Sequence, residues 1–199
     1  MNTDEIWRCV DDQRIELASL LEGLTAEQWT APSLCDGWRV RDVAAHLTHS
    51  HMHPARAIAE AVKSGFRFDA MISRLGREDR RSQAEIAAAL RTMAGARRKV
   101  PGTSVQQPLI ELLVHGQDIT VPLGIDRPMP VDAALEAAKT LSGMTFPVNA
   151  RRRLAGVRLV ATDADFAAGG GPWDDTGEVT EVRVPIREIV MILAGRAQP

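Results

Sequence analysis

Apolar residues at helical spacing dominate the first two thirds of the chain. Within the first 24 residues they recur at intervals of three, four or seven residues. Arg14 occupies the position of the stripe between Val10 and Leu17, where an apolar residue would be expected. The apolar positions are Trp7, Val10, Leu17, Leu21 and Leu24. This pattern predicts an amphipathic helix that ends near Gly23, before a polar turn at 25–27.

The same periodicity predicts four more helices. They cover residues 39–64, 82–99, 104 or 108 to 123, and 131–144. Pro54 removes a backbone donor and should kink or break the 39–64 helix. Ser82 and Glu85 have the spacing of a capping box, and Gly124 is a plausible C-cap.

The pattern changes near Pro147. Residues 157–162 and 178–184 alternate between apolar and polar, which predicts two half-buried strands. A last helix should begin at Pro185 and end at Gly195. We therefore predict a mainly α protein, with a helical bundle over 1–148 and a small α/β domain over 149–199.

Composition narrows the class of protein. The 199 residues include 24 basic and 26 acidic side chains, which argues against a generic nucleic-acid binder. No apolar run approaches the length of a membrane-spanning helix, and the first residues lack a signal-peptide pattern. Cys9 and Cys35 provide no disulfide framework, so we expect a cytoplasmic protein. Whether it is a monomer or a homodimer stays open.

Glu111 and His115 give the sharpest chemical signal. Four residues make slightly more than one helical turn, so the carboxylate and the imidazole share a face and could chelate one metal ion. Asp118, three residues further on, could orient the imidazole. The alternative is that Glu111 and His115 form a polar pair on a solvated face of the helix. The neighbouring residues are strongly apolar, however, and a carboxylate buried among them needs a cation.

A histidine cluster supplies a candidate third ligand. The second predicted helix contains an eight-residue stretch with four histidines: His46, His49, His51 and His53. A lone helical histidine is more often a core residue than a ligand. His46 is preferred because apolar residues lie on either side of it, whereas the roles of the other three stay undecided. Zinc with three protein ligands keeps an open position, which is typical of catalytic sites.

Three segments, in this order, together resemble a known family. Residues 29–47, reading WTAPSLCDGWRVRDVAAHL, resemble the signature of the DinB-like, mycothiol-dependent maleylpyruvate isomerase family. Residues 111–124, ELLVHGQDITVPLG, are similar to its second signature. GVRLVATDADFAAGGGPW and the later VPIREIVMILAGR resemble its small C-terminal domain. The turn at 174–177 differs from the family pattern, so the substrate could differ too.

The resemblance implies a fold and a chemistry. It implies a metal-binding four-helix bundle, with His46, Glu111 and His115 as ligands to a divalent metal, usually zinc. It also implies that the metal activates the thiol of mycothiol, and that Arg196 contributes to binding or turnover.

Two functions follow from these expectations. The first is a divalent-metal-dependent enzyme that uses mycothiol or a similar thiol for S-transfer or thiol-assisted cis–trans isomerisation of a small electrophilic or anionic substrate. The alternative is a non-catalytic bundle that binds a metal or small ligand and has a regulatory or interaction role.

Overall fold

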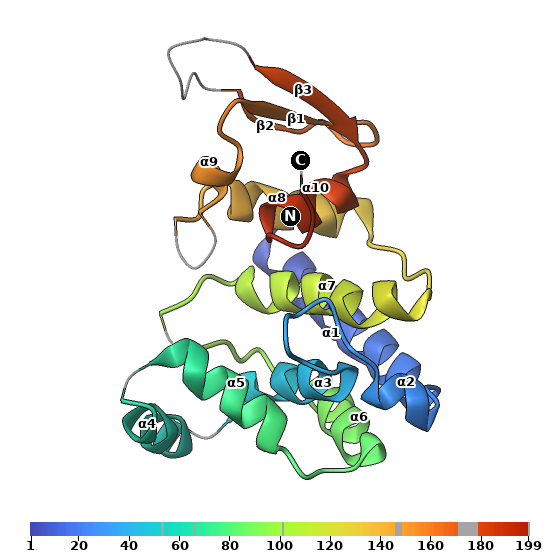
Figure 1. Cartoon of the computed structure of the whole chain (residues 1–199), viewed down its shortest axis with the longest axis vertical. Helices are drawn as coiled ribbons and strands as arrows, with labels where there is room; N and C mark the ends of the chain where they lie inside the picture. The colour runs from blue at the N-terminus through green and yellow to red at the C-terminus, as the bar shows by residue number, and fades with distance from the viewer. Residues whose placement is uncertain (53, 66, 101, 146–148, 171–178, 199) are drawn as a thin grey trace. The chain divides into compact units, whose positions relative to one another are not determined.

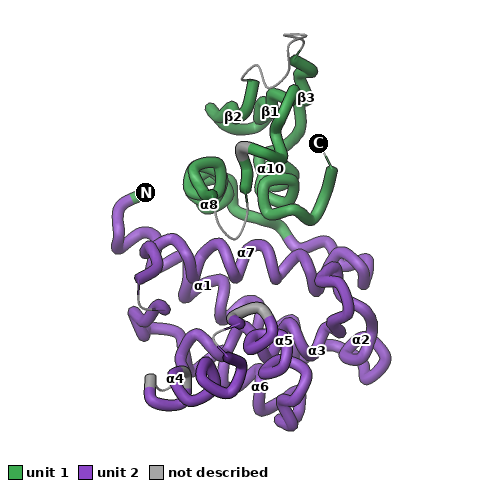
Figure 2. Tube along the Cα trace, turned by 60° about the vertical axis from the view of Figure 1, so that its left-hand side comes forward, with its two compact units in different colours: residues 1, 128–199 green, residues 2–127 purple. Residues whose placement is uncertain are grey.

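The computed structural model describes residues 1–52, 54–65, 67–100, 102–145, 149–170 and 179–198 (Figure 1). Contacts within the chain divide it into two compact units, coloured separately in Figure 2. The N-terminal unit comprises residues 2–127, and the C-terminal unit comprises residue 1 with residues 128–199. The sequence predicts a boundary at 148, whereas this division places the segment 128–148 in the C-terminal unit.

Four helices form the core of the N-terminal unit: α1 (Thr3–Glu22), α3 (Val40–Thr48), α6 (Gln83–Thr92) and α7 (Gln107–Thr120). Helices α1 and α3 each pack against both α6 and α7. Their apolar stripes are buried, including Val10, Leu17 and Leu21 of the first predicted helix. Burial of these stripes drives the helices together, as expected for a four-helix bundle.

Pro54 separates the second predicted helix into parts. Helix α3 ends at Thr48, a 3-10 turn η1 (His49–His51) follows, and α4 (Pro54–Lys63) begins at the proline. A proline is tolerated in the first turn of a helix because the amide at that position needs no intrahelical partner. The predicted break is therefore confirmed.

In the N-terminal unit, two helices and one helix end differ from the prediction; the short helix α9 (Ala150–Arg153) of the C-terminal unit was not predicted either. Helices α2 (Ala26–Thr30) and α5 (Phe68–Glu78) were not predicted, and α6 ends at Thr92 rather than near residue 99. A capping box at Thr25 begins α2, where the sequence indicated only a polar turn. Beyond α6, Gly95 has a φ of 80°, a left-handed conformation that a helix cannot continue through.

The predicted cap signals are confirmed. Ser82 and Glu85 form a capping box at the start of α6, with each side chain accepting a hydrogen bond from the other residue's backbone amide. Gly124 ends the 3-10 turn η2 (Val121–Leu123) that follows α7, with a left-handed φ of 67°.

The C-terminal unit combines a small sheet with helices. It contains α8 (Val131–Ser142), α9 (Ala150–Arg153), β1 (Val157–Ala161), β2 (Ala167–Gly169), β3 (Thr180–Val184) and α10 (Ile186–Leu193). The strand order is β2-β1-β3, with β1 antiparallel to β2 and parallel to β3. Helix α10 packs against both α8 and β1. Strand β2 was not predicted, and the altered turn at 174–177 lies outside the described residues.

The predicted fold class is confirmed: a mainly α chain, with a helical bundle followed by a small three-stranded α/β part. None of the helices in the described ranges is both long and apolar enough to cross a bilayer.

Candidate metal and thiol site

Helix α7 carries three of the predicted site residues on one face. Its sequence is the most apolar in the bundle, and Leu109, Leu113 and Ile119 are fully buried. This packing fixes the rotation of the helix about its axis. Glu111, His115 and Asp118 follow one another at intervals of four and three residues, so they lie along a single stripe.

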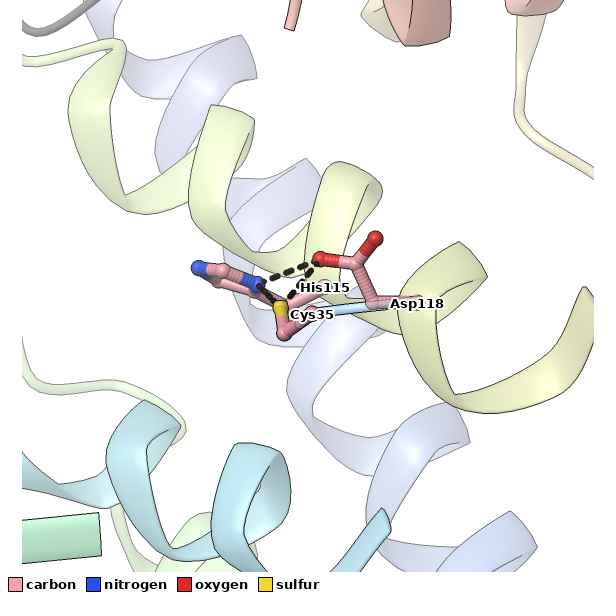
Figure 3. Close-up of side chains that lie close together, drawn as sticks. All are labelled: Cys35, His115 and Asp118. Atoms are coloured by element: carbon pink, nitrogen blue, oxygen red, sulfur yellow. Dashed lines mark hydrogen bonds and ion pairs between the residues drawn. The ribbon is translucent and has the colours of Figure 1, made fainter. Parts of the chain in front are cut away.

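Asp118 holds the imidazole of His115. Its carboxylate is fully buried, and the Oδ2 atom lies 2.8 Å from Nδ1 of His115. Because a carboxylate only accepts hydrogen bonds, Nδ1 carries the proton in this contact and Nε2 offers its lone pair. Figure 3 shows the far nitrogen of the ring pointing away from Asp118. The geometry suits an imidazole that binds a ligand through Nε2.

His46, on α3, lies beside His115. The two ring centroids are 5.1 Å apart, and the ring planes are nearly perpendicular. The indole of Trp38 makes a similar edge contact with His46, at 5.6 Å. Burial, with smaller effects from His115 and His49, holds the pKa of His46 well below its ordinary value. His46 is therefore neutral at pH 7, as a metal ligand must be.

Glu111 is a partly buried carboxylate on the same face of α7. Gln107 donates a hydrogen bond of 3.2 Å to its Oε1 atom. Desolvation raises the pKa of Glu111, and the hydrogen bond from Gln107 opposes this effect. A bound cation would offset the cost of this desolvated negative charge.

The predicted ligand set fits a divalent metal in its chemistry. Two imidazoles and one carboxylate are common zinc donors, and Nδ1 of His46 is buried with no hydrogen-bond partner in the described structure. The donor atoms of His46, Glu111 and His115 do not all lie within 4.8 Å of one another. Binding at this set therefore requires side-chain movement, and the assignment of these three residues stays a prediction.

Sequence reasoning missed Cys35. Its Sγ atom lies 3.1 Å from Oδ2 of Asp118 and 3.8 Å from Nδ1 of His115 (Figure 3). These three residues form the one group of metal-binding donors within 4.8 Å of one another that the described ranges contain. The only sequence signal for Cys35 is its place in the 29–47 signature, because nothing in residue spacing links it to α7.

A tight loop carries Cys35 to α7. Ser33 and Trp38 pair through their backbones, and Trp38 N donates to Cys35 O. Gly37 adopts a φ of 69° in this turn, which favours glycine. Leu34 N then donates a hydrogen bond of 3.0 Å to the backbone oxygen of Asp118. The loop is thus joined directly to the helix that carries His115.

The other histidines of the cluster, whose roles the sequence left undecided, and Arg196 have further partners; the ring centroid of His49 lies 6.5 Å from that of His46. Nε2 of His49 lies 3.3 Å from Asp79, and His51 contacts Arg14. His53 lies outside the described residues. Arg196 belongs to the C-terminal unit, where its guanidinium lies 3.5 Å from the backbone oxygen of Ala194.

His51 makes stability depend on pH. Its Nε2 atom lies 3.3 Å from the guanidinium of buried Arg14, which can only donate, so the ring is neutral in the folded state. Burial and the charges of Arg14 and Arg98 lower the pKa of His51 to about 4. The unfolded chain takes up this proton near pH 6.5. Stability is therefore full above pH 6.5 and falls as the pH drops toward about 4.

Replacing His51 should flatten this dependence. We expect metal-free His51→Gln to lose less stability than the wild type between pH 6.5 and 4, by about 1 kcal/mol because the site is partly solvated. Urea denaturation at a series of pH values measures the difference. Identical pH profiles for the two proteins would show that His51 is not neutral in the folded state.

Two comparisons with known proteins found similarities. Residues 10–100 match the family model of the mycothiol maleylpyruvate isomerase N-terminal domain. The crystal structure of a histidine-to-alanine mutant of the mycothiol-dependent maleylpyruvate isomerase has a similar fold, with a TM-score of 0.58 and 13% sequence identity. That likeness covers 99% of this chain and 90% of the other. No curated protein sequence matches the chain. The family-model match over residues 10–100 thus confirms the resemblance to the mycothiol-dependent maleylpyruvate isomerase family that the sequence motifs indicated, and the solved structure shows the same fold.

Proposed function

We propose that this protein is a divalent-metal-dependent enzyme that uses mycothiol, or a similar low-molecular-weight thiol, for S-transfer or thiol-assisted cis–trans isomerisation. The observation that carries the proposal is the meeting of His46 and His115, whose ring centroids lie 5.1 Å apart next to the buried Asp118 carboxylate. The family match over residues 10–100 supports the same chemistry. The proposed metal is zinc, and the substrate is a small electrophilic or anionic molecule.

Each residue near the metal has a distinct role in this proposal. Asp118 accepts a hydrogen bond from Nδ1 of His115, so that Nε2 would be the nitrogen available to a metal. Glu111 supplies a negative charge that would partly neutralise the divalent ion. The ion would in turn stabilise this desolvated carboxylate. Trp38 packs against His46 and keeps water away from that ring. Three protein ligands would leave a coordination position for the thiol.

When bound, the metal would favour the thiolate form of the thiol, which is the competent nucleophile. In isomerisation, the sulfur adds to one carbon of a cis double bond and the other carbon gains a proton. The carbon–carbon bond is then single and can rotate. Loss of the proton and cleavage of the carbon–sulfur bond return the thiol and the trans product. Arg196 is the proposed partner for an anionic group of the substrate.

A thiol-conjugation assay tests the proposal. We expect metal-loaded protein to accelerate the reaction of mycothiol with electron-poor alkenes, including a cis-configured one, by at least tenfold over chelator-treated protein. Product analysis by mass spectrometry separates S-conjugates from isomerised alkene. The Cys9→Ser variant is the control, because Cys9 does not belong to the site, and it should retain the rate.

The assay also separates the enzyme from its alternative. If metal-loaded and metal-free protein give the same rates with every electrophile, the enzyme proposal fails. Stoichiometric metal binding without any metal-dependent rate would favour the non-catalytic binding bundle.

A further inference from the structure

His115 has donor groups near both sides of its ring. Its Nδ1 atom faces Asp118 and Cys35, whereas its Nε2 atom points away from both (Figure 3). The proposed function uses only the Nε2 side. On the Nδ1 side, a thiol, a carboxylate and an imidazole nitrogen already lie together.

The spacing of these three donors is close to that of a tetrahedral metal site. With metal–sulfur bonds of about 2.3 Å and metal–nitrogen or metal–oxygen bonds of about 2.0 Å, neighbouring donors lie roughly 3.3 to 3.6 Å apart. The observed separations are 3.8 Å for sulfur to nitrogen, 3.1 Å for sulfur to oxygen and 2.8 Å for nitrogen to oxygen. Movements of about half an ångström would therefore suffice.

The chemistry of the donors selects the kind of ion. A cysteine thiolate is a soft ligand that favours Zn²⁺ and Cd²⁺ over Mg²⁺ or Ca²⁺. The thiolate and the carboxylate of Asp118, which has no solvent exposure, would together balance a divalent charge. We propose that Cys35, Asp118 and Nδ1 of His115 form a second site, which binds a thiophilic divalent cation.

Occupation of this site would change the state of His115. The thiol of Cys35 loses its proton to water when sulfur binds the ion, and the imidazole proton moves from Nδ1 to Nε2, so one proton is released per ion bound. A protonated Nε2 cannot bind a second metal. If the proposed function is correct, the Cys35 site and the His46, Glu111 and His115 set therefore exclude each other. Only this exclusion depends on the proposed function.

Cadmium titration tests the site directly. The probe is Cd²⁺ alone, added to metal-free full-length protein kept reduced with a phosphine, and the signal is the ultraviolet sulfur-to-cadmium charge-transfer absorption. We expect the wild type and Cys9→Ser to develop the band with one equivalent of Cd²⁺. Cys35→Ser should lose at least nine tenths of it while keeping its helical circular dichroism.

Two outcomes would overturn the site: absence of the band in both the wild type and Glu111→Gln, or its retention in Cys35→Ser. The first of these outcomes, together with the signal of Cys9→Ser, decides the matter even if Cys35→Ser fails to fold. Glu111→Gln removes a ligand of the competing set and should therefore show the band at one equivalent. Two tightly bound Cd²⁺ ions per wild-type chain, measured by calorimetry, would overturn the exclusion but not the Cys35 site.

Discussion

His115→Ala should abolish stoichiometric zinc binding while leaving the helical circular dichroism largely intact. The imidazole is the one side chain shared by the ligand set proposed for the enzyme and by the Cys35 site, so its loss removes a donor from both. It is also partly exposed, with 17% of its surface accessible, so its truncation removes little of the apolar core. Elemental analysis after dialysis measures bound metal, with far-ultraviolet circular dichroism beside it.

His51→Ala is the matched control. It removes an imidazole from the same histidine cluster but from neither proposed metal site, so it should retain the wild-type zinc content. A His115→Ala protein that still holds one tightly bound zinc per chain would contradict the assignment of this histidine. Loss of zinc in both variants would point to a general change in folding instead.

Leu17→Ala should lower the free energy of unfolding by about 3 kcal/mol, the loss typical of a fully buried leucine in a bundle core. Leu17 lies in the C-terminal half of α1 and is completely inaccessible to solvent. Its truncation removes apolar surface from the core and leaves a cavity that the surrounding helices fill only in part. Urea denaturation of the metal-free protein measures the loss as a lower midpoint.

Ile15 provides the control on the same helix. It lies two residues before Leu17 on the solvent side, with 43% of its surface exposed. Ile15→Ala should therefore change the free energy of unfolding by no more than about 0.5 kcal/mol. Equal losses from the two substitutions would mean that the apolar stripe of α1 does not face the core.

The bundle was predictable because the signals that mark its helices lie within short stretches of the sequence. The stripe from Trp7 to Leu21, the capping box at Ser82 and the break at Pro54 each depend on residues near one another in sequence. Helix α5 was missed although its apolar residues at 68, 71, 72 and 75 follow helical spacing, so the sequence carried a signal for it. Strand β2 is three residues long and alanine- and glycine-rich, so it has little strand propensity and gains its place by pairing with β1.

In the candidate site, too, relations between residues near in sequence were predictable and a contact between distant residues was not. Helical spacing places Glu111, His115 and Asp118 on one face of α7, because one helix fixes their relation. The contact of Cys35 with Asp118 joins positions 83 residues apart and depends on how the loop packs against that helix. No periodicity within the sequence encodes such a contact.

The hydrogen bond from Leu34 N to the backbone oxygen of Asp118 gives the site a tether made from main chain alone. The side chain of Leu34 is 36% exposed and takes no part in that bond. Most substitutions at this position would keep the amide, with proline as the exception. Side chains in this turn can therefore be substituted while the turn keeps its distance from the ligand-bearing helix. A main-chain tether of this kind lets related proteins keep the same site geometry although their sequences differ.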